Sequence, residues 1–473
     1  MRRDYIPDTI AAVSTPLGEG GIGIVRLSGG DSIKIADKIF LSKDGTRPSA
    51  FKSHTIHYGR IVRVGARDNK KARSNKETVD EVLLTVMKAP NTYTREDIVE
   101  INCHSGMVAI RKILDIVVRN GARVAEPGEF TKRAFLNGRL DLTQAEAVLD
   151  IIKAKTMAGL RVSLNQLSGS LSKEIKAIRD NILNTSAEIE TSIDFPEEDI
   201  EPSERKSWIK HIGETRERLD KLAKTYYQGA MLKEGVVAVI CGRANVGKSS
   251  LMNMLLKKDR VIVTHLPGTT RDAIEELINI NGIPIRLVDT AGFRRRKGLV
   301  EKAGMAKSRD YLAKADLIIC VIDGAERLTK EDSDLLKDIK DRPMIVVLNK
   351  CDLRRLVKMR DIRSIIGTKD IILMSCLDKS GLATLENTIY NKILGGEVYT
   401  SDELLLGNIR HKDAVERAAC SLRAAEEGIN GNAAGECISS DINDAIRSLN
   451  EVIGEIYADD ILDIIFSKFC IGK

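Results

Sequence analysis

The chain alternates between segments whose apolar residues favour strands and segments whose apolar residues recur at helical spacing. Close to the N-terminus, short apolar runs predict strands at 21–27, 82–87 and 98–101. Residues 109–118 place apolar side chains three and four positions apart, which predicts a helix. Residues 1–137 therefore predict a domain of mixed strands and helices, of the α+β class.

Further along, two long stretches at 138–233 and 395–473 have the polar and apolar faces of helices. An acidic segment with two prolines, 194–202, interrupts the first stretch, because proline ends helices. Between the two stretches, residues 234–394 alternate apolar runs with helical segments, as in a doubly wound parallel sheet. We therefore expect a discontinuous helical domain into which an α/β domain is inserted.

Composition adds to this picture in three ways. At 473 residues, the chain is too long for a single core and predicts about three domains. Aromatic residues make up only 4% of the sequence, which argues against a protein that reads single-stranded RNA purely by stacking. Because the net charge is only +6, contacts with nucleic acid would have to come from local basic patches.

The cysteine pattern and the N-terminus predict the compartment. The eight cysteines include no C-x2-C pair, which argues against a zinc site or a disulfide framework and favours a reducing compartment. The N-terminus lacks the apolar core of a secretory signal. No apolar run approaches the roughly 20 residues that span a bilayer. These features predict a soluble, cytoplasmic protein.

A phosphate-binding loop follows the apolar run at 236–240. It reads Gly242-x-x-x-x-Gly247-Lys248-Ser249 and leads directly into a helical pattern. The glycines let backbone N–H groups turn toward phosphate oxygens at the start of a helix. In that geometry Lys248 reaches the β- and γ-phosphates, and the Ser249 hydroxyl binds Mg²⁺. This stretch predicts a nucleotide-binding site.

The base of the nucleotide is predicted by a second motif. Asn349-Lys-Cys-Asp352 follows an apolar strand at 344–348. The Asp352 carboxylate can accept hydrogen bonds from N1–H and the 2-amino group of guanine, whereas adenine offers neither donor. Residues 375–377 follow the next predicted strand and would close over the base. The motifs together predict a GTPase.

A third motif concerns the γ-phosphate and the attacking water. Asp289-Thr-Ala-Gly292 follows the strand predicted at 283–288. Asp289 can hold Mg²⁺ through water, and the Gly292 N–H can contact the γ-phosphate. The next position, where Ras-like proteins carry a water-orienting glutamine, is Phe293, which cannot hydrogen-bond water. Glu301 lies in the same segment and is the candidate for this role.

Asn245, inside the phosphate loop, has two interpretations. It can ligate a monovalent cation such as K⁺, which would neutralise charge that develops between the β- and γ-phosphates. The other ligands of that cation would come from residues 264–272, where Thr270 is the natural Mg²⁺ ligand. Alternatively, Asn245 is only a turn residue, which is the simpler interpretation of this position taken alone.

Several segments resemble a known family. Gly268-Thr-Thr-Arg-Asp272, Asn245 in the phosphate loop and the C-terminal Phe469-Cys-Ile-Gly-Lys473 are similar to the tRNA modification GTPases of the MnmE family, also called TrmE. The resemblance covers essentially the whole chain and includes N-terminal segments such as 20–29 and 89–97. Other GTPases share only the nucleotide motifs.

For the GTPase site, the resemblance implies a K⁺-activated enzyme in which hydrolysis is triggered when two G domains dimerise across the cation. Glu301 matches the family's water-orienting glutamate, and Lys248 and Asn245 complete the implied catalytic set. The matched positions are Asn245, Thr264, Leu266 and Thr269 for K⁺, Ser249 and Thr270 for Mg²⁺, and, for GTP, Asn245, Val246, Gly247, Lys248, Ser249, Ser250, Thr264, His265, Leu266, Pro267, Gly268, Thr269, Thr270, Asp289, Thr290, Ala291, Gly292, Asn349, Lys350, Cys351, Asp352, Ser375, Cys376 and Leu377.

For the N-terminal domain, the resemblance implies a constitutive homodimer that binds 5-formyltetrahydrofolate, a one-carbon carrier. A carboxylate suits the donor edge of the pterin, and cations suit the glutamate tail. The family acts with the FAD-containing protein MnmG, in a heterotetramer or larger complex, to add a carboxymethylaminomethyl or aminomethyl group at C5 of the wobble uridine of certain tRNAs. The implied folate contacts are Arg26, Glu100, Arg139 and Lys473.

Three positions depart from the family's pattern. Ala244 replaces a proline of the phosphate loop, and Arg95 and Ser105 replace glycines that are common in the N-terminal motif. The resemblance also leaves open whether Cys470, close to the implied folate site, is a reactive thiol, because reactivity depends on its pKa and exposure.

Two other functions explain part of the sequence. A ribosome-assembly GTPase, acting as a binding switch, would explain the nucleotide motifs and the mild basicity, but not Arg26, Glu100 and the Cys-Ile-Gly-Lys C-terminus. A folate-dependent one-carbon enzyme regulated by GTP would need a complete transfer site within this chain. Few histidine or cysteine residues cluster to form one.

Overall fold

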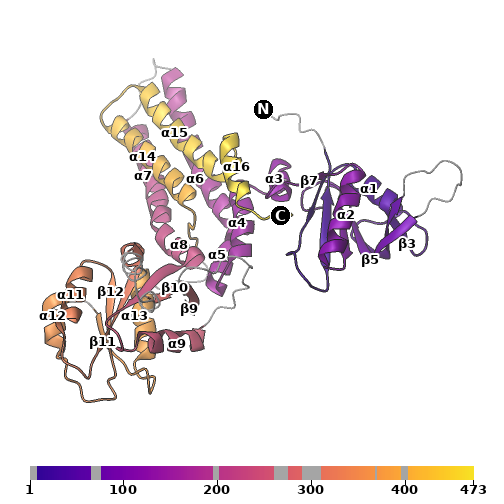
Figure 1. Cartoon of the computed structure of the whole chain (residues 1–473). Coiled ribbons are helices and arrows are strands. Elements are labelled where there is room, and N and C mark those ends of the chain that lie inside the picture. Colours follow the sequence, from indigo (N-terminus) through magenta and orange to yellow (C-terminus); the bar gives the residue numbers. More distant parts are fainter. Residues whose placement is uncertain are drawn as a thin grey trace. The chain divides into compact units, whose positions relative to one another are not determined.

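The computed structural model describes residues 8–64, 76–194, 202–259, 275–289, 310–367, 370–395 and 403–473 (Figure 1). The chain forms two compact units, Met1–Leu149 with Ile453–Lys473, and Asp150–Val452. Each unit contains one of two β-sheets together with helices, so the expected mixed α/β class is confirmed. The domain boundaries expected near residues 137, 233 and 394 stay predictions.

The first unit is built on a sheet with helices over one face. Its elements are β1 (Ile10–Val13), β2 (Gly23–Ser28), α1 (Ser32–Ile39), β3 (Phe40–Ser42), the short 3₁₀ helix η1 (Pro48–Ala50), β4 (Thr55–Val64), β5 (Lys76–Met87), β6 (Ile98–Cys103), α2 (Met107–Arg119) and β7 (Arg123–Val124). The strands predicted at 21–27, 82–87 and 98–101 and the helix predicted at 109–118 are thereby confirmed.

The strand order in this sheet is β3-β4-β5-β6-β2-β1-β7. Neighbouring strands are antiparallel, apart from the parallel pair β1 and β7. The apolar sides of α1 and α2 pack against the strands in a core that includes Ile35, Ile101 and Ile113. Burial of these aliphatic side chains holds the helices on the sheet.

The C-terminal residues also belong to the first unit. They directly follow α16 (Asp459–Ser467). This helix shares an apolar cluster with α3 (Glu129–Leu136) and α4 (Leu142–Lys153), and the cluster includes Phe135, Leu142 and Phe466. The backbone N–H of Phe130 donates to the carbonyl of Lys473 over 3.2 Å. The end of the chain is therefore held against the start of α3.

The second unit contains a six-stranded sheet with helices on both faces. Its elements are β8 (Val236–Cys241), α9 (Lys248–Asp259), β9 (Glu275–Ile280), β10 (Ile283–Asp289), β11 (Leu317–Asp323), α11 (Lys330–Ile339), β12 (Met344–Asn349), α12 (Met359–Ile366), β13 (Asp370–Leu373) and α13 (Leu382–Leu394). The strand order is β13-β12-β11-β8-β10-β9. One core joins α9 and α13 to the sheet, and another joins α11 and α12 to it.

One strand departs from the expected doubly wound parallel sheet. β9 runs antiparallel to β10, whereas the other pairs are parallel. The turn between them is Asn281-Gly282, with φ of 50° and 97°. Positive φ at both positions is the backbone of a tight hairpin turn, and so short a turn can join only antiparallel strands. The apolar runs alone do not carry this information.

Helices that precede this sheet in the sequence contact helices that follow it. They are α5 (Met157–Leu167), α6 (Ser170–Asp194), α7 (Pro202–Lys224), α8 (Tyr226–Glu234), α14 (Ile409–Asn430) and α15 (Gly435–Ile453). Figure 1 shows α6, α7, α14 and α15 side by side, and Arg216 of α7 forms an ion pair with Glu426 of α14 over 3.2 Å. Among the described helices, none has the length and apolar content needed to cross a membrane.

Candidate functional site

The phosphate loop lies between β8 and α9, and the local backbone explains its glycines. Gly242 and Gly247 have φ of 142° and 103°, in the region that favours glycine. A Cβ atom at residue 247 would lie 2.1 Å from Nδ2 of Asn349. Glycine at this position therefore lets the guanine-specificity segment approach the phosphate loop.

Lys248, the first residue of α9, is buried and folds back over this loop. Its ammonium donates hydrogen bonds to the carbonyls of Gly242 and Arg243, over 2.9 and 2.6 Å. The next residue, Ser249, donates to Oδ2 of Asp289 over 3.4 Å. A hydroxyl and a carboxylate thus lie together at the carboxyl ends of β8 and β10, and such oxygen ligands suit Mg²⁺.

Asn245 has a left-handed backbone, with φ of 62°, and is exposed. Asparagine tolerates this conformation better than other residues with a side chain. This geometry fits both interpretations, a turn residue and a cation ligand.

The remaining positions expected around the phosphates lie outside the described residues, so their placement stays a prediction. They are Thr264, His265, Leu266, Pro267, Gly268, Thr269, Thr270, Thr290, Ala291, Gly292 and Glu301.

The guanine-specificity segment is hydrogen-bonded to the phosphate loop. Asn349, at the end of β12, donates from Nδ2 to the carbonyl of Val246 over 2.9 Å. Its Oδ1 accepts from the backbone N–H of Cys376 over 3.1 Å. One side chain therefore fixes the phosphate loop relative to the loop after β13.

Asp352, the expected guanine-binding residue, is held by that same loop. The hydroxyl of Ser375 donates to Oδ1 of Asp352 over 2.6 Å. This bond leaves the other carboxylate oxygen for a ligand and fixes the orientation of the carboxylate. Burial raises the pKa of Cys376 to about 11, so this thiol stays protonated at neutral pH.

One residue of this site was missed in the sequence. Asp323, at the end of β11, is buried, and its Oδ2 lies 2.5 Å from Nζ of Lys350. Lys350 also has a left-handed backbone, with φ of 63°. The ion pair with Asp323 at the end of β11 holds the strained backbone at Lys350, just after β12, in place. The signal was an aspartate at the end of an apolar run, as at Asp289.

A second cluster of charged residues lies in the first unit. Arg26 on β2 and Glu100 on β6 are direct partners in the sheet register, and Nε of Arg26 donates to Oε1 of Glu100 over 2.7 Å. A second guanidinium N–H of Arg26 donates to the carbonyl of Gly472 over 3.4 Å. The C-terminal segment that ends at Lys473 therefore reaches this pair.

Tyr93 connects this pair to Arg139. The Arg139 guanidinium lies 4.7 Å from the centre of the Tyr93 ring, a cation–π arrangement. The Tyr93 hydroxyl is hydrogen-bonded to Thr131 over 2.9 Å. Burial raises the pKa of Tyr93, although the positive charges of Arg139 and Arg26 act in the opposite direction. Arg139 therefore contacts an aromatic residue to which the sequence analysis gave no role, and Tyr93 in turn packs against the apolar cluster of Phe130, whose ring centre lies 5.7 Å from Arg26.

Cys470 lies in the same C-terminal segment. Its carbonyl accepts a hydrogen bond from the backbone N–H of Gly128 over 3.4 Å, and its thiol is exposed and free. The backbone at this position is therefore held in place, whereas the thiol faces solvent.

Comparison with known proteins gives matches to both parts of the chain. A family model described as the MnmE helical domain matches residues 142–470, and one described as the GTP-binding protein TrmE N-terminus matches residues 9–139. A protein from Thermoanaerobacter pseudethanolicus named tRNA modification GTPase MnmE is 47% identical over 98% of this chain and 99% of its own length. A protein of the same name from Acetivibrio thermocellus is 45% identical over 99% of this chain and 100% of its own length.

Among solved structures, a variant of Aquifex aeolicus Era bound to GDP·AlF4⁻ is 26% identical over 39% of this chain and 65% of its own, with a TM-score of 0.26. The family models and the nearly full-length similarity to named relatives lead to one conclusion. The chain belongs to the MnmE family of tRNA modification GTPases.

Proposed function

We propose that this chain is a GTP hydrolase that acts in the cytoplasm with the FAD-containing protein MnmG. Together they would add a carboxymethylaminomethyl or aminomethyl group at C5 of the wobble uridine of certain tRNAs. The observation that carries the proposal is the joining of a phosphate loop to a guanine-specificity segment through Asn349, in a chain of this family.

The proposed hydrolysis uses the residues of the second unit in distinct roles. Lys248 would hold the β- and γ-phosphates, and Ser249 and Thr270 would hold Mg²⁺, whose charge would stabilise the phosphates, with Asp289 as a further carboxylate beside Ser249. Glu301 orients the attacking water, because Phe293 cannot. Support for this arrangement comes from the hydrogen bond between Ser249 and Asp289.

A monovalent cation is the second part of the proposed hydrolysis. Asn245, Thr264, Leu266 and Thr269 would hold K⁺ beside the phosphates, where a positive charge stabilises the transition state. Closure of this site would require two G domains to meet, so hydrolysis depends on their dimerisation.

The charged cluster of the first unit is proposed to bind a reduced folate. The Glu100 carboxylate can accept hydrogen bonds from the donor edge of the pterin, while Arg26, Arg139 and Lys473 provide positive charge for its anionic part. Tyr93 adds an aromatic surface beside Arg139, and Phe130 adds one beside Arg26.

The first unit is also proposed to dimerise through the sheet face that carries this cluster. Partners in the sheet register share a face, so Ile56, Thr85, Glu100 and Arg26 form one row across the strands. Apolar side chains lie on the same face, with exposed fractions of 64% for Ile56, 50% for Tyr58 and 45% for Leu83. An exposed apolar surface of this kind marks a protein contact, and a second copy is the proposed occupant.

Replacing Leu83 by Glu is expected to weaken this dimer at least about tenfold, because a buried carboxylate without a partner is costly. Sedimentation equilibrium would measure the dissociation constant. Val108→Glu is the matched control, since Val108 is an exposed apolar residue on α2, which covers the opposite face of the sheet. An unchanged dimer in Leu83→Glu would exclude this face.

The function itself is tested by mass spectrometry of wobble uridines from cells that lack the chain. We expect the modified nucleosides to disappear and to return when the wild-type gene is restored. Unchanged wobble uridines together with a defect in ribosomal subunits would favour the ribosome-assembly alternative and would contradict the proposal.

A further inference from the structure

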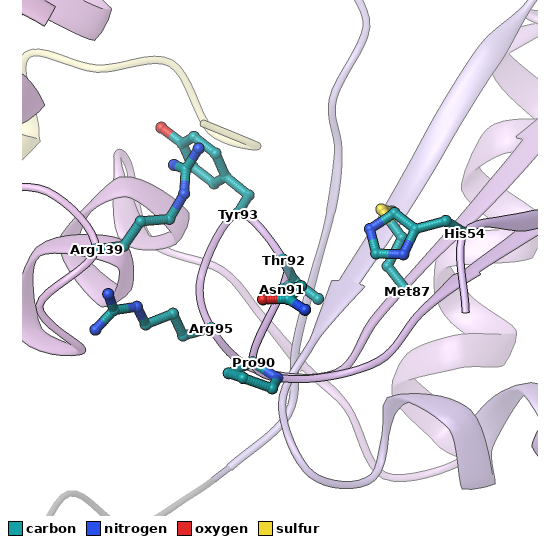
Figure 2. Close-up of a pocket in the computed structure, with 8 residues that line it drawn as sticks. All are labelled: His54, Met87, Pro90, Asn91, Thr92, Tyr93, Arg95 and Arg139. Carbon is teal, nitrogen blue, oxygen red and sulfur yellow. The ribbon is translucent and has the colours of Figure 1, made fainter. Parts of the chain in front are cut away.

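A cavity of about 450 Å³ opens beside Tyr93 and Arg139 (Figure 2). Its volume is in the range that holds a small organic ligand. His54 and Met87 line one side, and Arg95 and Arg139 line the other. Arg139, one of the residues proposed to bind folate, therefore lines this cavity together with Arg95, which was not among them.

The lining of this cavity is positively charged. It includes the guanidinium groups of Arg95 and Arg139, and none of its lining residues is acidic. The two carboxylates of the same loop have other partners: Glu96 accepts from Ser28 over 2.7 Å, and Asp97 accepts from the backbone N–H of Ala89 over 2.9 Å. The cavity therefore favours an anion.

Arg95 is held in a strained backbone at the edge of this cavity. Its φ of 60° is left-handed, which is unusual for a residue with a long side chain. One guanidinium N–H donates to the carbonyl of Asn137 over 2.8 Å, so the side chain is oriented toward the loop that carries Arg139. A glycine here would avoid the strain. Strained residues of this kind cluster at sites where ligands bind.

The placement of Arg139 indicates which anion the cavity would take. Arg139 stacks on the Tyr93 ring, Tyr93 packs against the apolar cluster that contains Phe130, and Arg26 lies 5.7 Å from the centre of the Phe130 ring. A ligand whose ring lies at Arg26 and Glu100 could therefore extend past Tyr93 to Arg139 and Arg95. In a reduced folate, the groups beyond the ring end in the carboxylates of a glutamyl residue.

We propose that Arg95, together with Arg139, binds the carboxylates of the glutamyl tail of the reduced folate. Arg95 is thereby a specificity-determining residue of this chain for glutamylated folates. Guanidinium groups suit this role because they bind carboxylates through paired hydrogen bonds. The inference rests on the proposed folate-binding function and adds the position of the tail to it.

The test is calorimetric titration of the full chain with 5-formyltetrahydrofolate and with 5-formyltetrahydropteroate, which lacks the glutamyl residue. The wild type should bind the glutamylated ligand more tightly. Arg95→Gly should weaken that binding about three- to tenfold and leave the affinity for the pteroate unchanged. Glycine is favoured at this φ, so the variant should fold.

Two further variants test whether a loss of affinity comes from the positive charge at residue 95 or from a general loss of surface charge. Arg95→Lys keeps the charge and should retain part of the preference, whereas Arg111→Gln removes an exposed arginine of α2 outside the cavity and should change nothing. Equal losses for both ligands in Arg95→Gly, or no loss for either, would overturn the role of Arg95 while leaving folate binding intact. If the wild type bound neither ligand, the proposed folate function itself would fail.

Discussion

Replacing Asp352 by Asn is expected to lower the affinity for GTP by about 10²- to 10⁴-fold and to raise the affinity for XTP. The carboxylate accepts two hydrogen bonds from guanine, and bonds to a charged group contribute about 1.5–3 kcal/mol each. An amide would meet the 2-amino group of guanine with its own N–H₂. Xanthine carries a carbonyl at that position, so the same amide would donate a hydrogen bond to it.

The structure supports this prediction because the carboxylate of Asp352 has a fixed orientation. Ser375 holds one oxygen of Asp352 over 2.6 Å, so the carboxylate is oriented before the base arrives. Titrations with fluorescent derivatives of GTP and XTP would measure the affinity of each variant for the two nucleotides. Asp338→Asn, which changes an exposed carboxylate on α11, is the matched control and should keep wild-type affinities. Tight GTP binding by Asp352→Asn would show that another group reads the base.

The phosphate loop and the guanine motif could be predicted because each is encoded in a short stretch. An apolar run fixes a buried strand, and the polar residues at its end then meet at one edge of a parallel sheet. The structure places Asp289 and Asn349 at the ends of strands, Asp352 shortly after β12, and Lys248 at the start of α9, after the loop that follows β8. Their roles toward GTP remain predictions.

The remaining features depend on contacts between distant residues. The ion pair between Asp323 and Lys350 joins the ends of the neighbouring strands β11 and β12, and the hydrogen bond from Phe130 to Lys473 joins two segments that lie far apart in the sequence. The end of an apolar run marks Asp323 as a candidate, but no local pattern identifies its partner Lys350 or the bond between Phe130 and Lys473. Tyr93 was missed for the same reason, since its role depends on Arg139, which approaches from a different loop. The antiparallel strand β9, in contrast, had a local signal in its Asn-Gly turn.

The second large effect is expected from removing the Asn245 side chain. Asn245→Gly should slow GTP hydrolysis by about 10²-fold with little change in GTP affinity, because the cation would stabilise the transition state more than the bound substrate. The left-handed φ of 62° makes glycine the suitable replacement, since alanine would be strained there. Single-turnover rates and nucleotide titrations would separate the two quantities.

Another left-handed asparagine provides the control. Asn281, with φ of 50°, lies in the turn between β9 and β10, so Asn281→Gly makes the same chemical change outside the phosphate loop. It should hydrolyse GTP at the wild-type rate. Equal rates for Asn245→Gly and the wild type would make Asn245 a turn residue only.

Cation dependence is the most direct test of the proposed GTPase mechanism. Phosphate release from GTP should be measured with the purified full chain in KCl and in NaCl at equal ionic strength. We expect hydrolysis to be on the order of tenfold faster or more in K⁺, because only the fitting cation completes the site beside the phosphates. Equal rates in the two salts would contradict the account.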